Sequence, residues 1–164
     1  MKKRIIALGL LWCLSAVMLQ AARVDTVLVR SAAMNKDVKV VYVLPDKAIG
    51  KQACPVVYLL HGYGGNARSW VQLKPELPQM ADEKGIIFVC PDGKNSWYWD
   101  SPENPAYRYE TFVTSELVKY TDGNYATIPD RKARAISGLS MGGHGALWSA
   151  IRHKDVFGAA DSTP

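Results

Sequence analysis

The chain has 164 residues, of which 48% are hydrophobic, enough to form one globular domain with a substantial core. Its formal net charge is +5, but residues 2–4 contribute three of these charges and no acidic residue precedes Asp25, so the rest of the chain carries +2. A charge this small, with both signs interspersed, excludes an extended basic surface and predicts no nucleic-acid partner.

Residues 1–22 have the composition of a signal peptide. The basic start at residues 2–4 is followed by a mainly apolar segment over residues 5–19 and by a small-residue cleavage site around Ala21. This apolar segment is shorter than the ~20 residues that a spanning helix needs, so we expect cleavage and no stable membrane anchor. An uncleaved tether is the alternative. We therefore predict an exported protein, periplasmic or extracellular, whose folded domain occupies residues 23–164.

The remaining sequence alternates between strand-like and helix-like segments. This alternation predicts an α/β fold with a mostly parallel sheet of about five to six strands and flanking helices. We expect the first two strands to be antiparallel, and residues 91–108 to form a long loop. The predicted strands cover residues 24–30, 38–44, 54–60, 86–90 and 133–140; the predicted helices cover residues 66–73, 75–81 and 109–120 and begin again at residue 141; residues 45–52 are a predicted loop, and residues 122–124 a predicted helix stop.

A G-x-S-x-G pentapeptide at residues 138–142 joins the last predicted strand to the last predicted helix. In this context it predicts a nucleophile elbow, a turn so tight that Gly138 and Gly142 stand where larger side chains would not fit. The turn would present the Ser140 hydroxyl at the carboxyl edge of the sheet, beside the first turn of a helix. A glycine-rich turn without a catalytic role is the alternative. The helix is supported by apolar residues that share one face: Ala146, Leu147, Ala150 and Ile151.

The third predicted strand ends in the sequence H-G-Y-G-G at residues 61–65. Acyl transfer needs two donors aimed at the oxygen that becomes negative, and a glycine-rich loop can turn a backbone N–H group inward to supply one. In α/β-hydrolases one donor follows the nucleophile and the other comes from this loop, which assigns the N–H groups of Met141 and Tyr63, with Gly62 in the loop. Taken alone, the loop is equally consistent with an ordinary strand-to-helix connection.

The long loop contains Trp97-Tyr98-Trp99-Asp100 beyond the carboxyl end of the fourth strand. Ligands of α/β proteins bind at this edge, so we interpret the three aromatic rings, and Trp97 and Trp99 in particular, as a substrate wall for a sugar ring or a phenolic acyl group. Packing of these rings as a lid on the core is the alternative.

Two cysteines, Cys54 and Cys90, belong to the predicted domain, near opposite ends of parallel strands. Their separation, more than ~15 Å, exceeds the ~7 Å limit for a disulfide, so we expect two buried, unpaired thiols. No histidine-carboxylate cluster has metal-ligand spacing and no phosphate-binding glycine loop occurs, so we expect neither a metal nor another cofactor.

Three motifs together resemble a known family: H-G-Y-G-G at residues 61–65, P-D-G at residues 91–93 and G-L-S-M-G-G-H-G-A-L at residues 138–147. They are similar to the putative-esterase branch of the α/β-hydrolases, which includes S-formylglutathione hydrolases, feruloyl and acetyl xylan esterases, tributyrin-type esterases and mycolyltransferases. The resemblance spans roughly residues 25 to 160. It implies a carboxylic-ester hydrolase with Ser140 as nucleophile and backbone oxyanion donors at Tyr63 and Met141.

Family members place an acidic residue and then a histidine after the serine, whereas this sequence continues for 24 residues beyond Ser140. His61 belongs to the loop, His144 lies one turn down the helix, and His153 lies about 19 Å along it. We therefore expect the N-terminal part of an esterase domain, incomplete at the C-terminus and inactive by itself.

Three functions remain open. The first is an exported serine esterase that acts on short-chain acyl or carbohydrate-linked acetyl or feruloyl esters. The second is an acyltransferase that uses the same serine. The third is a non-catalytic carbohydrate-binding remnant.

Overall fold

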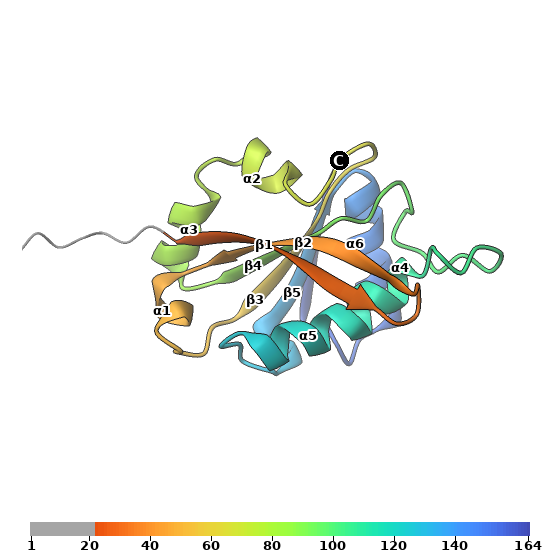
Figure 1. Ribbon diagram of the computed structural model, residues 1–164. Coiled ribbons are helices and arrows are strands. Elements are labelled where there is room, and N and C mark those ends of the chain that lie inside the picture. Colours follow the sequence, from red (N-terminus) through yellow and green to blue (C-terminus); the bar gives the residue numbers. More distant parts are fainter. Residues whose placement is uncertain (1–21) are drawn as a thin grey trace, which may run out of the picture.

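The computed structural model describes residues 22–164, in which helices cover both faces of a six-stranded sheet (Figure 1). The strand order is β1-β2-β4-β3-β5-β6; β1 and β2 are antiparallel, β2 is antiparallel to β4, and the other neighbours are parallel. The α/β prediction and the antiparallel opening pair are thus confirmed. The strands are β1 (Arg23–Ser31), β2 (Lys36–Leu44), β3 (Val56–Leu60), β4 (Ile87–Pro91), β5 (Arg134–Leu139) and β6 (Ala159–Thr163).

The helices depart from the predicted boundaries in several places. Those predicted over residues 66–73 and 75–81 occupy Ser69–Leu73 and Leu77–Lys84. The segment predicted as a loop at residues 45–52 contains one short helix. The helix predicted to stop at residues 122–124 includes them, and the chain becomes extended only at Tyr125. The helices are α1 (Asp46–Ile49), α2 (Ser69–Leu73), α3 (Leu77–Lys84), α4 (Tyr109–Thr111), the π-helical turn η1 (Phe112–Glu116), α5 (Leu117–Asn124), the 3-10 turn η2 (Arg131–Ala133) and α6 (Met141–Arg152).

The core lies in two layers, one on each face of the sheet. Strand β2 shows the division, because Val40 and Tyr42 belong to the layer under α5 and α6, whereas Val41 and Val43 belong to the layer under α3. Alternating side chains of one strand point to opposite faces, so β2 supplies both layers. Burial on both faces explains why the central strands read as continuous apolar runs.

Helix α6 buries a different face from the one its larger apolar residues predict. Ala146 is buried as expected, but Leu147 is 43% exposed and Ile151 is 66% exposed. After Met141, which is buried in the core at the start of the helix, the buried face consists of small residues, which let the helix backbone approach β3 and β5 closely: Gly142, Gly143, Gly145 and Ser149 lie on it.

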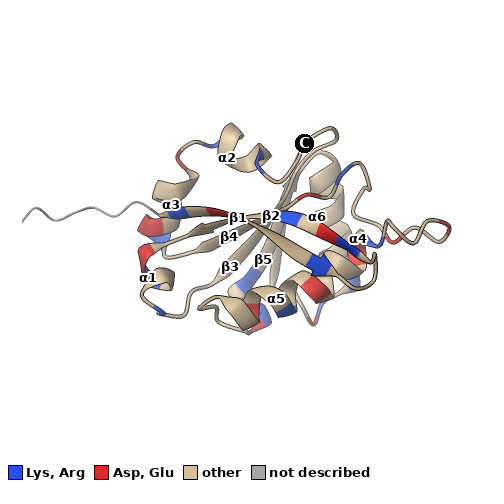
Figure 2. Cartoon of the chain, in the orientation of Figure 1, with Lys and Arg blue, Asp and Glu red and all other residues tan. Residues whose placement is uncertain are grey.

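Both cysteines of the domain are free and buried, as expected. Burial raises the pKa of the Cys90 thiol to about 12. Charged residues of both signs are interspersed over the described elements (Figure 2).

The segment predicted as a signal peptide lies outside the described residues, apart from Ala22. Among residues 22–164, no helix has the length and apolar character required to cross a bilayer.

Candidate active site

The turn between β5 and α6 holds Ser140 in a rare backbone conformation. Its φ of 52° and ψ of −114° lie outside the regions that residues with a Cβ normally occupy. Ser140 is solvent-exposed, its N–H group donates to the Thr163 carbonyl of β6 at 2.9 Å, and its carbonyl accepts from the N–H group of His144 at 3.0 Å. Strain of this kind persists only where surrounding contacts enforce it, and it is common at functional sites.

Two glycines of the pentapeptide provide the space for this turn. A Cβ added to Gly138 would lie 2.2 Å from the backbone of Gly142, and a Cβ on Gly142 would lie 2.2 Å from the Leu60 carbonyl oxygen. A Cβ on Gly62 would make only ordinary contacts, the nearest being 3.4 Å from the Leu139 carbonyl oxygen. Close backbone packing therefore requires glycine at 138 and 142, whereas position 62 is not sterically closed.

The loop after β3 runs beside the elbow. The Cβ position of Gly62 is 3.7 Å from Ser140 Cβ, which brings the two turns into contact. Within residues 22–164, the N–H groups of Tyr63 and Met141 donate no hydrogen bond. Two amides without an internal acceptor, on turns that flank an exposed hydroxyl, have the composition of an oxyanion hole.

His61 is a buried structural residue of this loop. Its Nδ1 lies 2.7 Å from the Gly62 carbonyl oxygen, and its Nε2 lies 2.9 Å from the N–H group of Gly93. A neutral ring whose Nδ1–H donates and whose Nε2 accepts satisfies both contacts. The ring therefore braces the loop and is not directed at Ser140.

Tyr98, predicted to be part of an aromatic wall, is instead completely buried beneath the same loop. Its hydroxyl accepts from the His61 N–H group at 3.0 Å and lies 3.3 Å from the His61 carbonyl oxygen. A Cβ at Gly93 or Gly145 would come within 2.3 or 2.6 Å of the ring. Only glycine leaves room for this ring, which locks the loop onto α6.

Replacing Tyr98 with phenylalanine is expected to lower the free energy of unfolding by about 1–2 kcal/mol, because the buried His61 N–H group loses its acceptor. Urea denaturation measures the change. Tyr107→Phe is the matched control, since Tyr107 is partly exposed and its hydroxyl makes no hydrogen bond within the described residues. Equal losses in the two variants would contradict the bracing role of the Tyr98 hydroxyl.

The other two histidines are also engaged away from the nucleophile. His144 Nδ1 lies 3.3 Å from the Trp97 carbonyl oxygen, and its ring packs against Trp97 and Trp99 with centroids 5.6 and 5.4 Å apart. His153 Nε2 lies 2.8 Å from Glu110 Oε1. In the part of the chain that the structure describes, no histidine or carboxylate hydrogen-bonds to the Ser140 hydroxyl.

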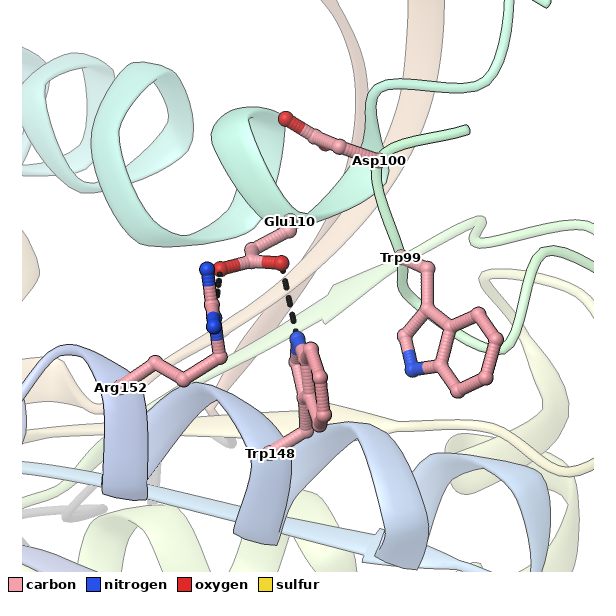
Figure 3. Close-up of a pocket in the computed structure, with 5 residues that line it drawn as sticks. All are labelled: Trp99, Asp100, Glu110, Trp148 and Arg152. Atoms are coloured by element: carbon pink, nitrogen blue, oxygen red, sulfur yellow. Dashed lines mark hydrogen bonds and ion pairs between the residues drawn. The ribbon is translucent and has the colours of Figure 1, made fainter. Parts of the chain in front are cut away.

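Trp97 and Trp99, the predicted wall, are 46% and 48% exposed, and the ring of each packs against His144. Sequence reasoning missed three residues that extend this group: Glu110, Trp148 and Arg152. Trp148 and Arg152 line a pocket of about 290 Å³ together with Trp99, Asp100 and Glu110 (Figure 3). For Trp148 and Arg152 a signal was present in the sequence: they follow His144 at intervals of four residues, which places the three side chains on one face of a helix.

Glu110 ties the pocket to α6. Its carboxylate accepts hydrogen bonds from Trp148 Nε1, Arg152 Nε and His153 Nε2, each at 2.8 Å. Burial alone would raise the pKa of Glu110, but these three bonds outweigh burial and lower the pKa below its ordinary value of 4.5. No group of three or more metal-ligating side chains occurs among residues 22–164.

The sequence model of the family described as "Putative esterase" matches residues 31–163. An acetyl esterase of Caldicellulosiruptor saccharolyticus is 28% identical over 135 residues, which cover 77% of this chain and 50% of the relative. A diacylglycerol acyltransferase/mycolyltransferase of Mycobacterium gordonae is 33% identical over 149 residues, which cover 85% of this chain and 42% of the relative.

The solved structure of an S-formylglutathione hydrolase from Agrobacterium tumefaciens matches with a TM-score of 0.77 and 27% identity, over 87% of this chain and 57% of that one. The chain thus spans about half the length of the curated relatives it matches. With the family model covering most of the sequence and the sheet matching in three dimensions, the chain belongs to the esterase family of the α/β-hydrolases.

Proposed function

We propose that this chain is the nucleophile-bearing part of an exported serine carboxylic-ester hydrolase. Its substrates would be short-chain acyl esters or carbohydrate-linked acetyl or feruloyl esters. The observation that carries the proposal is the exposed Ser140 hydroxyl, held at a φ of 52° between two amides that have no internal acceptor. The domain would begin at residue 23, after a cleaved export signal, and would use no cofactor.

In the proposed reaction, Ser140 Oγ attacks the ester carbonyl and its proton passes to a general base. The N–H groups of Tyr63 and Met141 stabilise the oxyanion of the tetrahedral intermediate. The intermediate collapses, the alcohol leaves with the proton from the base, and an acyl-enzyme remains. Water then cleaves the acyl-enzyme by the same steps and restores the serine.

None of the three histidines of this sequence is placed to act as the general base. All three histidines of the sequence hold other partners, at the Gly62 loop, the Trp97 carbonyl and Glu110. A serine without a base keeps its oxyanion donors but loses most of its nucleophilicity. We therefore infer that the 164-residue chain by itself turns over esters very slowly.

A fluorophosphonate probe tests this function, because it reacts with serine hydrolase nucleophiles and needs no knowledge of the ester. We expect slow labelling of Ser140 in the chain alone, and faster labelling when free imidazole supplies the base. Trypsin releases residues 135–152 as one peptide, and its fragment spectrum distinguishes Ser140 from the neighbouring Ser137 and Ser149.

Two variants complete the labelling experiment. Ser140→Ala should abolish labelling with and without imidazole, whereas Ser137→Ala, on the same peptide, should retain it. Label on another serine, or no label at any imidazole concentration, would refute the assignment of Ser140 as the nucleophile.

An acyltransferase is the second candidate, because one relative that covers 85% of this chain is named a diacylglycerol acyltransferase/mycolyltransferase. It would use the same acyl-enzyme, with a sugar hydroxyl in place of water. Product analysis with and without an added sugar acceptor separates the two, since a transferase forms a new ester only when the acceptor is present.

A further inference from the structure

The side chains that follow Ser140 at intervals of four residues form one face of α6. His144, Trp148 and Arg152 occupy this face, and each step of four residues advances about 6 Å along the helix axis. Trp148 is therefore about 12 Å and Arg152 about 18 Å along the axis from the nucleophile. The face connects the elbow to the pocket lined by Trp99, Asp100, Glu110, Trp148 and Arg152.

Aromatic rings form a continuous group along this face. The ring of Trp148 stacks on that of His144 with centroids 6.1 Å apart and meets that of Trp99 at 5.6 Å. The Arg152 guanidinium carbon lies 4.9 Å from the Trp148 ring centroid, and Figure 3 shows Arg152 and Trp99 on opposite sides of Trp148. These contacts fix the Trp148 ring and leave Trp99 as the more exposed platform.

Some polar groups that line the pocket have hydrogen-bond partners within the protein, and others have none. All the hydrogen bonds that the Glu110 carboxylate accepts come from Trp148, Arg152 and His153, so this carboxylate serves to hold the pocket wall. The Nη groups of Arg152 donate no hydrogen bond within residues 22–164, and the Asp100 carboxylate accepts only from Thr111. The pocket thus offers free guanidinium donors beside an exposed indole ring, whereas both oxygens of Asp100 already accept from Thr111.

We propose that this pocket is a subsite for a pyranose ring of the substrate, on the part of a glycan that lies one or more sugar units from the ester. A pyranose ring has an apolar C–H face that stacks on an indole and a rim of hydroxyl groups that pair with donors and acceptors. Trp99 supplies the platform, and the Nη groups of Arg152 supply the polar donors.

The position favours a sugar over an aryl acyl group. An acyl group is bonded to the carbonyl that Ser140 attacks, so even an extended aryl acyl group reaches only the part of α6 nearest the nucleophile and falls short of Arg152, about 18 Å along the axis. The Trp148 and Arg152 side of the pocket lies two to three turns along the helix from Ser140, within reach of a chain of linked sugar rings. The inference rests on the proposed function, because it identifies the alcohol side of that ester as a glycan.

Binding of sugars without an ester tests the subsite separately from catalysis. Xylotetraose and cellotetraose are titrated into the full chain and into its Ser140→Ala variant, with intrinsic tryptophan fluorescence and calorimetry as readouts. We expect both proteins to bind at least one of these sugars with the same affinity. Trp99→Ala should weaken binding about tenfold, Trp99→Phe should retain most of it, and Ile151→Ala, an exposed apolar residue on the same helix, should change nothing.

Three results would overturn the proposal. They are the absence of binding at millimolar sugar with the protein folded by circular dichroism, equal binding by the Trp99→Ala and Ile151→Ala variants, and binding of ferulate at Trp99 with no binding of sugar. Fluorophosphonate labelling of Ser140 does not require the pocket. A chain that is labelled but binds no sugar therefore loses the subsite and keeps the proposed function.

Discussion

Gly142→Ala is expected to destabilise the domain by about 3 kcal/mol or more, at the upper end of what overpacking costs. The added Cβ would lie 2.2 Å from the Leu60 carbonyl oxygen and 2.7 Å from that of His61. Both oxygens belong to the backbone where β3 ends and the glycine-rich loop begins, so no flexible side chain can move aside. To relieve the clash, α6 must shift away from the sheet.

The shift would also displace the elbow, since Met141 and Ser140 directly precede this position. We therefore expect the variant to lose fluorophosphonate labelling as well as stability, measured by urea denaturation of the same preparation. Among marginally stable domains, a loss of this size is a large share of the free energy of unfolding.

Gly123→Ala is the matched control for this variant. Gly123 also lies in a helix, but a Cβ there meets no atom within 4 Å. Alanine has the higher helix propensity, so this substitution should stabilise the protein by as much as about 1 kcal/mol. If both substitutions had the same effect, close packing of α6 on β3 would not be the reason for glycine at position 142.

The strands were predictable because burial leaves a continuous apolar signal. The runs ending at Leu60 and Cys90 could be assigned from hydrophobicity alone, and the structure places β3 and β4 in parallel at the sheet centre. The orientation of α6 was not predictable in this way. Apart from Met141, its buried residues are glycines, alanine and serine, which give little hydrophobic signal, so periodicity pointed to Leu147 and Ile151, which are exposed.

The candidate site likewise contains residues that the sequence could predict and residues that it could not. Ser140 and the glycines around it form a recognisable sequence motif, because the tight turn restricts which residues fit. No sequence motif marks the role of Tyr98. Its neighbours in the sequence, Trp97 and Trp99, are exposed, and only tertiary contacts distinguish the three rings. Glu110 was invisible for the same reason: its partners lie 38 to 43 residues away along the chain.

Glu110→Gln is expected to lower the free energy of unfolding by about 2 kcal/mol at pH 7. Charge-assisted hydrogen bonds contribute more than neutral ones, and glutamine keeps the size of the side chain while losing the charge and one acceptor. The ion pair between Arg152 and Glu110 contributes less to this free energy than a buried pair would, because the Arg152 side chain is half-exposed and solvent screens the charges. Glu103→Gln, in the exposed loop, removes the same charge without breaking a side-chain bond and should have almost no effect.

The contribution of the Glu110 carboxylate to the free energy of unfolding should decrease at acid pH. Because the folded-state pKa of Glu110 is lowered, its carboxylate stabilises the fold fully above the ordinary value of 4.5, and that stability is lost as the pH falls through the folded-state pKa. The difference in unfolding free energy between the wild type and Glu110→Gln should therefore narrow below about pH 4.5. A difference that stays constant from pH 7 to pH 3 would mean that the bonds to Trp148, Arg152 and His153 do not depend on the charge of Glu110, and the rigid wall inferred for the pocket would lose its electrostatic basis.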